Sequence, residues 1–372
     1  MKQFKHILVA LLCATALQAS TPWIDVMKLI AKNSLYEAEK AIDELVAFQG
    51  ENLQSTKARA MLYHKKGDRR QAILEFERAL YRYGDDSQIL STLAGIYMEE
   101  GETEKALRYL KKAQELSPQS HRLSYATKRI EREHRIQKSY QTVQRGRFSI
   151  TFENTWDQPQ VKELLARRLE QALDELEDKL WKYPGSKIPV VLYPTHRTFR
   201  NVLHAPAWSA AAWDNKLRIP ISEQGRLNES AILPLLRHEL THFLIAVKVR
   251  GRHVPAWLNE GMAQIAERRG TIRARSYLKR LKRSRKFKLF TLPQLNASFA
   301  RFGAGHARLA YIQAIMAVTF MKDKFGDDSD IRTVERLARG DNSERALRSV
   351  TGLSYKDFEA NYRRWLNDEL GP

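Results

Sequence analysis

The 372-residue sequence predicts an α+β protein, in which an all-α repeat solenoid precedes a domain with a small mixed sheet and a helical C-terminal part. Three observations lead to this prediction. The first third of the chain repeats with a period of 34 residues and shows no strand pattern. Strand-like alternation begins only after residue 146. A His-Glu-x-x-His pentapeptide lies further along, on a predicted buried helix.

Residues 1–19 form a predicted secretory signal peptide, with a short basic start, an apolar run over 7–17 and a small residue at the cut. The run is shorter than the roughly 20 residues of a membrane-spanning helix, and an uncleaved anchor is the alternative. Cys13, the only cysteine, lies within the run, so the mature chain can form no disulfide or thiolate metal site. We therefore expect an exported protein of the bacterial periplasm or cell envelope.

The chain is strongly basic, with a formal net charge of +20 and a pI near 9.9. Such an excess of cations would ordinarily indicate a nucleic-acid partner. For an exported chain we expect no nucleic acid. Anionic lipid headgroups, acidic surface polymers, or a diffuse basic surface without a specific partner are the alternatives.

Five columns of the 34-residue period keep their register over three copies. They are Asn33, Gly67 and Gly101 at a turn, then Ala38, Ala72 and Ala106, then Ile42, Phe76 and Leu110, then Leu45, Ala79 and Ala113, and finally Gly50, Gly84 and Pro118. The alanine column allows paired helices to approach closely. This spacing resembles tetratricopeptide repeats over about residues 22–120, and the resemblance implies a protein-binding solenoid. Residues 121–144 predict a polar capping helix that completes a domain of residues 20–145.

Residues 146–372 form the second predicted domain. Residues 148–152 alternate as a strand, 161–182 have the period of an amphipathic helix, and 188–193 read as a buried strand. A helical stretch near residue 198 leads to a short strand that ends at Pro220. Because proline cannot donate a ladder hydrogen bond, this strand is expected at the edge of the sheet, or the proline at its end.

The chemistry-bearing motif lies on a predicted helix over about residues 229–248. His238 and His242 are one helical turn apart, so both imidazoles project from one face and can share a metal ion. Glu239 is adjacent and can take a proton from metal-bound water and deliver it to a leaving amine. The alternative interpretation is that the two histidines only satisfy hydrogen bonds in a core.

A second predicted helix follows, with Pro255 at its first position. It carries Glu260, Gln264 and Glu267 on a single face. Zinc hydrolases use three protein ligands and leave one coordination position open. Glu260 is therefore the predicted third ligand of one zinc ion.

Residues 147–370 resemble the gluzincin metallopeptidases of the thermolysin-like superfamily, in particular the bacterial peptidase MA-like domain often joined to tetratricopeptide repeats. The matching segments are 213–220, 238–242, 254–263, 310–314 and 352–358. The resemblance implies a thermolysin-like (zincin) fold, with His238, His242 and Glu260 as zinc ligands and Glu239 as general base and acid. Gln264 stands where some relatives have an acid that supports a histidine ligand, and its amide can accept the same hydrogen bond less strongly.

The same resemblance implies roles outside the metal ligands. An edge strand near Lys216, Leu217 and Arg218 would hold an extended peptide substrate by strand addition. Tyr311 is the candidate group that stabilises the oxyanion, with His306 as the alternative.

Between Arg268 and Lys288 the sequence has eleven Lys or Arg and no acid, interleaved with apolar residues. This pattern indicates either a basic surface for an anionic envelope component, lipid or polymer, or a solvated helix face over the core.

The remaining residues, 292–370, read as helical. Ser354 and Asp357 have the spacing of a capping box at the start of a last helix that belongs to the core.

Two functions follow from these observations. The first is an exported zinc-dependent peptidase that hydrolyses peptide bonds through a zinc-activated water, with the repeats binding a protein partner or substrate. The second is a non-catalytic repeat adaptor with a peptidase-like domain. Glu239 favours the enzyme, because a decayed site has no chemical reason to keep that carboxylate beside the histidines.

Overall fold

In a computed structural model the chain divides into two compact units, residues 1–131 and 132–372. The residues described are 21–31, 34–155, 159–185, 187–203, 212–213, 216–220, 229–268, 270–284, 288–299 and 302–371. The predicted signal peptide lies outside these ranges. None of the described helices is long and apolar enough to cross a membrane.

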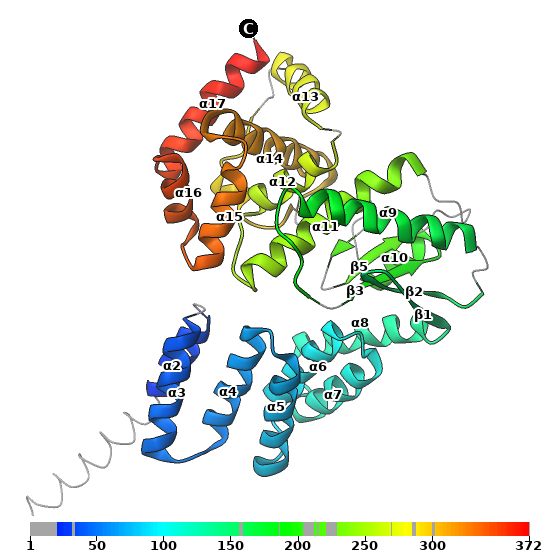
Figure 1. The fold of residues 1–372 in the computed structure, drawn as a ribbon, viewed down its shortest axis with the longest axis vertical. Coiled ribbons are helices and arrows are strands. Elements are labelled where there is room, and N and C mark those ends of the chain that lie inside the picture. Colours follow the sequence, from blue (N-terminus) through cyan, green and yellow to red (C-terminus); the bar gives the residue numbers. More distant parts are fainter. Residues whose placement is uncertain are drawn as a thin grey trace, which may run out of the picture. The chain divides into compact units, whose positions relative to one another are not determined.

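The first unit is built from helices and confirms the predicted repeats (Figure 1). Its helices are α2 (Thr21–Ala31), α3 (Leu35–Gln49), α4 (Leu53–Lys66), α5 (Arg69–Tyr83), α6 (Ser87–Glu99) and α7 (Thr103–Leu116), followed by α8 (His121–Gln137), which crosses the division between the units. The alanine column, Ala38, Ala72 and Ala106, is fully buried. Gly67 and Gly101 have positive φ, at 86° and 85°, where the chain turns between paired helices.

Side-chain caps explain where several of these helices begin. Asn52 accepts hydrogen bonds from two backbone N–H groups of α4, both at 3.0 Å. Asp86 does the same for α6, both at 2.9 Å. These acceptors satisfy the N–H groups that the first turn of a helix leaves without a partner.

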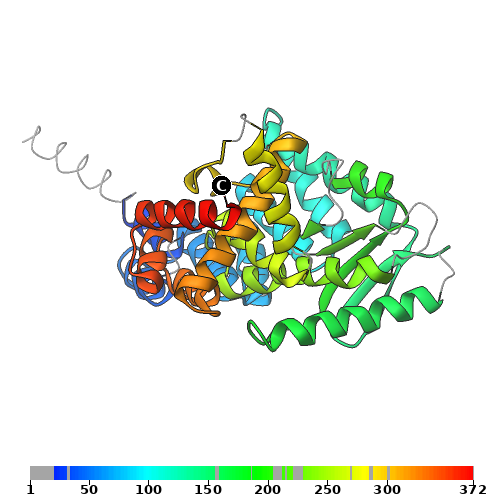
Figure 2. The ribbon, with the colours of Figure 1, turned by 90° about the horizontal axis from the view of Figure 1, so that it is seen from above.

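The second unit contains the predicted small mixed sheet, with strand order β1-β2-β3-β5-β4. The strands are β1 (Tyr140–Arg145), β2 (Phe148–Glu153), β3 (Ile188–Tyr193), β4 (Ala212–Trp213) and β5 (Leu217–Pro220). β2, β3 and β5 are parallel neighbours, and both outer strands run antiparallel to them. Helices α9 (Pro159–Glu177) and α11 (Glu229–Val249) share one apolar core with the sheet (Figure 2). Helix α10 (His196–Leu203) packs against β3 through Phe199 and Val202.

Strand β1 corrects the sequence analysis, which placed its residues in the polar capping segment. The helix ends at Gln137, and residues 140–145 pair with β2 instead. Four of the six side chains of β1 are exposed, so the strand has no apolar alternation to read. Its conformation comes from backbone pairing with β2 across a two-residue turn.

The rest of the second unit is helical, as predicted. It contains α12 (Ala256–Ala266), α13 (Thr271–Arg283), a 3-10 turn (Pro293–Leu295), α14 (Ala304–Phe325), α15 (Ser329–Arg339), α16 (Ser343–Thr351) and α17 (Tyr355–Leu370). Helix α14 is the most buried of these and contacts α12, α13, α15 and α17. Ser354 accepts a hydrogen bond from the Asp357 N–H at 3.1 Å, and the aromatic face of α17 lies in the core as expected.

Candidate metal centre

Helix α11 presents the two histidines next to each other. Leu236 and Leu240 on its opposite side are fully buried against the sheet, which fixes the rotation of the helix. The Nε2 atoms of His238 and His242 are 3.1 Å apart, and the ring planes are inclined by 85°. Both imidazoles therefore direct Nε2 toward one point, as the one-turn spacing predicts.

Helix α12 adds Glu260 to this point. Its Oε2 lies 3.7 Å from His238 Nε2 and 3.5 Å from His242 Nε2. Pro255 is the residue just before the helix rather than its first residue. Gly261 packs directly on α14, where a Cβ would lie 2.5 Å from the carbonyl oxygen of Ala314. The glycine therefore sets how closely the helix that carries Glu260 can pack.

The three groups fit a zinc ion. Ligands of a tetrahedral zinc at the usual bond lengths are about 3.3 Å apart, and the three separations here are 3.1, 3.5 and 3.7 Å. Glu260 Oε2 is buried and accepts no hydrogen bond from the described residues. A buried carboxylate oxygen without such a partner is costly unless a cation satisfies it.

The outer nitrogens of both rings have polar neighbours. His242 Nδ1 lies 3.0 Å from Asn259 Oδ1. Glu267 Oε1 lies 2.5 Å from His238 Nδ1, close enough for an ion pair but outside the direction of an N–H···O hydrogen bond. Groups at these outer nitrogens orient metal-binding histidines and raise their basicity.

From the sequence we expected Gln264 to have this supporting role, and the structure differs. The Gln264 side chain donates to the backbone oxygen of Tyr311 at 2.8 Å and so connects α12 to α14. Asn259 and Glu267 were missed as supporting residues. Glu267 had a usable signal, because it shares a helix face with Glu260, and Asn259 directly precedes Glu260 in the motif.

The electrostatics of the site favour a cation. Burial raises the pKa of Glu239, which is 6% exposed, although the two histidines act in the opposite direction. Burial also opposes ionisation of His242 and Glu260, but their attraction outweighs it: the pKa of His242 rises to about 9, and that of Glu260 is lowered. With Glu267, three carboxylates surround two imidazoles.

A second ionic group links the helices that carry the ligands. Glu175 of α9 accepts a hydrogen bond from Arg237 Nε at 2.9 Å, and its Oε2 also lies 2.9 Å from an Arg268 nitrogen. Arg237 directly precedes the first histidine and is 7% exposed, whereas Arg268 follows α12. This contact therefore holds α11 and the end of α12 to the same residue of α9.

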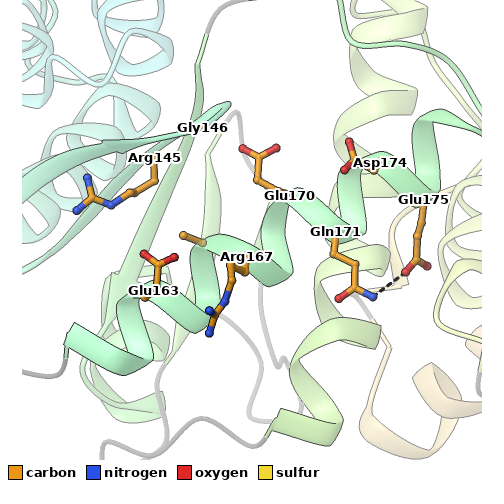
Figure 3. Close-up of a pocket in the computed structure, with 9 residues that line it drawn as sticks. Arg145, Gly146, Glu163, Arg167, Glu170, Gln171, Asp174 and Glu175 are labelled. Carbon is orange, nitrogen blue, oxygen red and sulfur yellow. Dashed lines mark hydrogen bonds between the residues drawn. The ribbon is translucent and has the colours of Figure 1, made fainter.

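The outer side of α9 also borders a depression of about 510 Å³ (Figure 3). It is lined by Arg145, Gly146, Glu163, Ala166, Arg167, Glu170, Gln171, Asp174 and Glu175. Neither histidine nor Glu260 contributes to it. The depression is therefore separate from the metal centre, although both involve α9 through Glu175.

The two candidates for the oxyanion group lie in different surroundings. Burial raises the pKa of the Tyr311 phenol, and Glu260 and Glu239 raise it further, so this phenol lies near the carboxylates of the site. Its ring also contacts Phe299 edge-on, with the ring centres 5.2 Å apart. His306 is exposed in the first turn of α14 and lies against Phe290. Tyr311 thus remains the candidate, and its catalytic role stays a prediction.

The strand that ends at Pro220 is not the edge of the sheet, and the other placement that the sequence allowed is confirmed, because Pro220 is the last residue of β5. β5 lies between β3 and β4, and Leu217 and Arg218 pair with β4. Leu217 is in the core, and Arg218 is 1% exposed, donating to Tyr193 at 2.5 Å and to Glu133 at 3.0 Å. Lys216 is also buried beside Glu133. The two-residue strand β4 takes the edge because it pairs antiparallel with β5. Substrate binding by Lys216–Arg218 stays an untested prediction.

Comparison with known families gives one match in each of the two compact units. A family model described as Peptidase MA superfamily matches residues 176–368, more than half of the chain. A model described as tetratricopeptide repeat matches residues 58–86 and 87–120. No curated protein matches the chain. The first match contains both histidines, Glu239 and Glu260.

Proposed function

Because the chain belongs to the Peptidase MA superfamily, we propose that it is a gluzincin-type zinc peptidase whose repeats bind a protein partner or substrate. The observation that carries the proposal is the convergence of His238, His242 and Glu260, whose ligand atoms lie within 4.8 Å of one another. Tetratricopeptide repeats supply extended surfaces for protein binding. The substrate is accordingly a protein or peptide.

Each residue of the centre has a distinct part in this proposal. His238 and His242 bind through Nε2, while Glu267 and Asn259 hold their outer nitrogens. The two histidines and Glu260 would hold a zinc ion, which when bound would supply Lewis-acid activation of water and of the peptide carbonyl. The Glu239 carboxylate takes the proton from the attacking water and delivers it to the leaving amine. Its burial raises its pKa, which strengthens it as the base that takes the proton and favours the protonated form that later delivers it.

The Tyr311 phenol is proposed to donate a hydrogen bond to the developing oxyanion. Two observations support this role. The phenol lies close enough to Glu260 and Glu239 for both carboxylates to raise its pKa, and the Gln264 side chain holds its backbone oxygen at 2.8 Å. A group fixed in this way needs little reorganisation as charge develops.

The test of the proposed activity is the substitution Glu239→Gln. We expect the wild-type protein to carry one zinc ion and to cleave an unfolded protein, and the variant to keep the zinc but lose cleavage by roughly 10²- to 10⁴-fold, the usual contribution of a general acid and base. Glu163→Gln is the matched control, because Glu163 is an exposed carboxylate on α9 away from the centre. It should keep full activity.

Other outcomes would refute parts of the proposal. A protein that can be neither isolated with zinc nor reconstituted with it would contradict the assignment of the ligands. One zinc per chain without cleavage of a broad peptide library would favour the alternative of a repeat adaptor. Metal analysis and cleavage of a quenched peptide library distinguish these outcomes.

We also propose that the protein is exported before it acts. The basic start, the apolar run and the small residues of the first 19 positions support this proposal. N-terminal sequencing of the protein recovered from the periplasm of a bacterial host should give Ser20 as the first residue. Recovery in the membrane fraction with an intact Met1 would favour the uncleaved anchor.

A further inference from the structure

Helix α13 lies beside α14 and α17, next to the C-terminal end of the chain (Figure 1). Its apolar side is already used in the core, where Ala274 is 3% exposed and Leu278 is fully buried. Arg275 and Lys282 bind α17 and the residue after it, through Glu369 and the backbone oxygen of Gly371. This half of the helix is therefore fixed to the second unit.

The other half of the helix faces outward and is cationic. Its exposed residues are Ile272, Arg273, Ser276, Lys279, Arg280 and Arg283. At 100° per residue these positions cover an arc of about 120° on the helix. Ile272 is 77% exposed and lies within this arc, between Lys279 and Arg283. We call Ile272, Arg273, Lys279, Arg280 and Arg283 the α13 cationic face.

The acid that α17 brings to this helix, Glu369, pairs with Arg275, which lies outside the face. The sequence from Arg268 to Lys322 contains no Asp or Glu. Within the part of the chain that the structure describes, the four cations of the face make no ion pair with an acid. Arg280 instead lies over the ring of Tyr277, 5.4 Å from its centre, and Arg308 of α14 lies over the same ring at 4.6 Å. The positive surface therefore continues from α13 onto α14.

We propose that the α13 cationic face binds the surface of an anionic lipid bilayer, with Ile272 entering the headgroup region. Four cations without acidic partners complement such a surface, and an isolated aliphatic side chain among them suits the interface between headgroups and chains. The face is the exposed side of a single helix. A polypeptide made mainly of acidic residues would offer Ile272 few apolar contacts, whereas a bilayer offers an apolar region directly below its charged surface.

This inference is independent of the proposed peptidase activity, because it requires neither zinc nor cleavage. It would place the second unit at a membrane surface without a spanning helix. The attraction is electrostatic and should weaken as salt screens it. Each cation near an anionic surface contributes about a fivefold increase in partitioning.

The test is sedimentation with vesicles of phosphatidylcholine containing 30% phosphatidylglycerol, using the chain that begins at Ser20 so that the apolar leader does not contribute. The variant carries Arg273→Gln, Lys279→Gln, Arg280→Gln and Arg283→Gln. We expect wild-type binding that is absent on pure phosphatidylcholine and a loss of at least tenfold in the variant. Zinc content and the thermal melt of both proteins should be equal, because all four residues are exposed.

A matched control removes the same charge from α15 to α17, by Arg339→Gln, Arg345→Gln, Arg348→Gln and Lys356→Gln, all at exposed positions. This control should retain most of the binding. Equal binding by the α13 variant and the wild type would refute the proposal. Equal losses in both variants would also refute it, because net charge alone would then explain binding. Binding to polyglutamate but not to vesicles would assign the face to an acidic polypeptide instead.

Ile272→Ser gives an independent check that leaves all charges in place. We expect this variant to lose less vesicle binding than the variant that lacks four charges. The difference from the wild type should persist at a salt concentration that removes most of the electrostatic attraction. An unchanged affinity in this variant would contradict insertion of Ile272 into the headgroup region.

Discussion

Glu267 is expected to tune the metal affinity of the centre, although it is not a ligand. The substitution Glu267→Gln keeps the shape of the side chain and removes its charge. In the structure the carboxylate lies 2.5 Å from His238 Nδ1, and the side chain of His238 is 14% exposed. Without the charge, the imidazole is oriented less firmly and becomes a weaker donor to a metal ion.

The magnitude follows from the exposure of the contact. Supporting groups of this kind contribute 10- to 100-fold to metal affinity. The Glu267 side chain is 28% exposed, so solvent screens part of its charge and the lower end applies. We expect zinc to bind about tenfold more weakly to the variant, which corresponds to about 1.4 kcal/mol.

A substitution of Gln264 tests whether Glu267, as in the structure, or Gln264, as expected from the sequence, supports a histidine ligand. In the structure its amide binds the Tyr311 backbone oxygen and neither histidine. Gln264→Leu should therefore lower the free energy of unfolding of the metal-free protein by about 1 kcal/mol and change zinc affinity less than Glu267→Gln does. Competition titration against a chromophoric chelator measures the affinity, and urea unfolding measures the stability. A larger loss of zinc affinity in Gln264→Leu than in Glu267→Gln would refute the reasoning.

Three further predictions concern packing and charge. Gly261→Ala should destabilise the second unit by about 1–3 kcal/mol and weaken zinc binding in the same titration, because the new Cβ meets the Ala314 carbonyl oxygen at 2.5 Å. Glu175→Gln should lower the free energy of unfolding by about 1–2 kcal/mol at pH 7, since it leaves the buried Arg237 without its carboxylate partner and the Glu175 side chain is 25% exposed. Burial raises the pKa of Glu175, but donors including Arg237 lower it overall. The stability that the Glu175 carboxylate contributes is therefore present above the unfolded pKa of about 4.3 and is lost as the pH falls through the lower folded pKa. In urea unfolding the stabilities of the two proteins should converge toward low pH, and a constant difference would contradict the assignment. Ala72→Phe should destabilise the repeats by about 1–3 kcal/mol in a thermal melt, because Ala72 is fully buried between paired helices.

Features that depend on local spacing were predictable from the sequence. The alanine column is buried in all three copies because each repeat uses the same helix contact, and period alone reveals it. His238 and His242 face one point because a helical turn places them there, whatever the surroundings. The Ser354 cap is equally local, since it joins residues three apart.

Features that depend on a distant partner were not predictable. Strand β1 has mostly exposed side chains and exists because β2 pairs with it. Strand β4 is two residues long, yet it displaces β5 from the sheet edge. Glu267 and Gln264 both follow Glu260 on one helix face. The position of α14 gives Gln264 its partner, and the position of α11 gives Glu267 its partner, His238.

The most direct measurement of the central claim is the anomalous signal of crystals at the zinc absorption edge. We predict one zinc peak per chain at about 2.0–2.2 Å from His238 Nε2, His242 Nε2 and Glu260 Oε2. Glu239 should lie beside this peak without binding the ion. A peak at other residues, or none in crystals grown with zinc, would contradict the account.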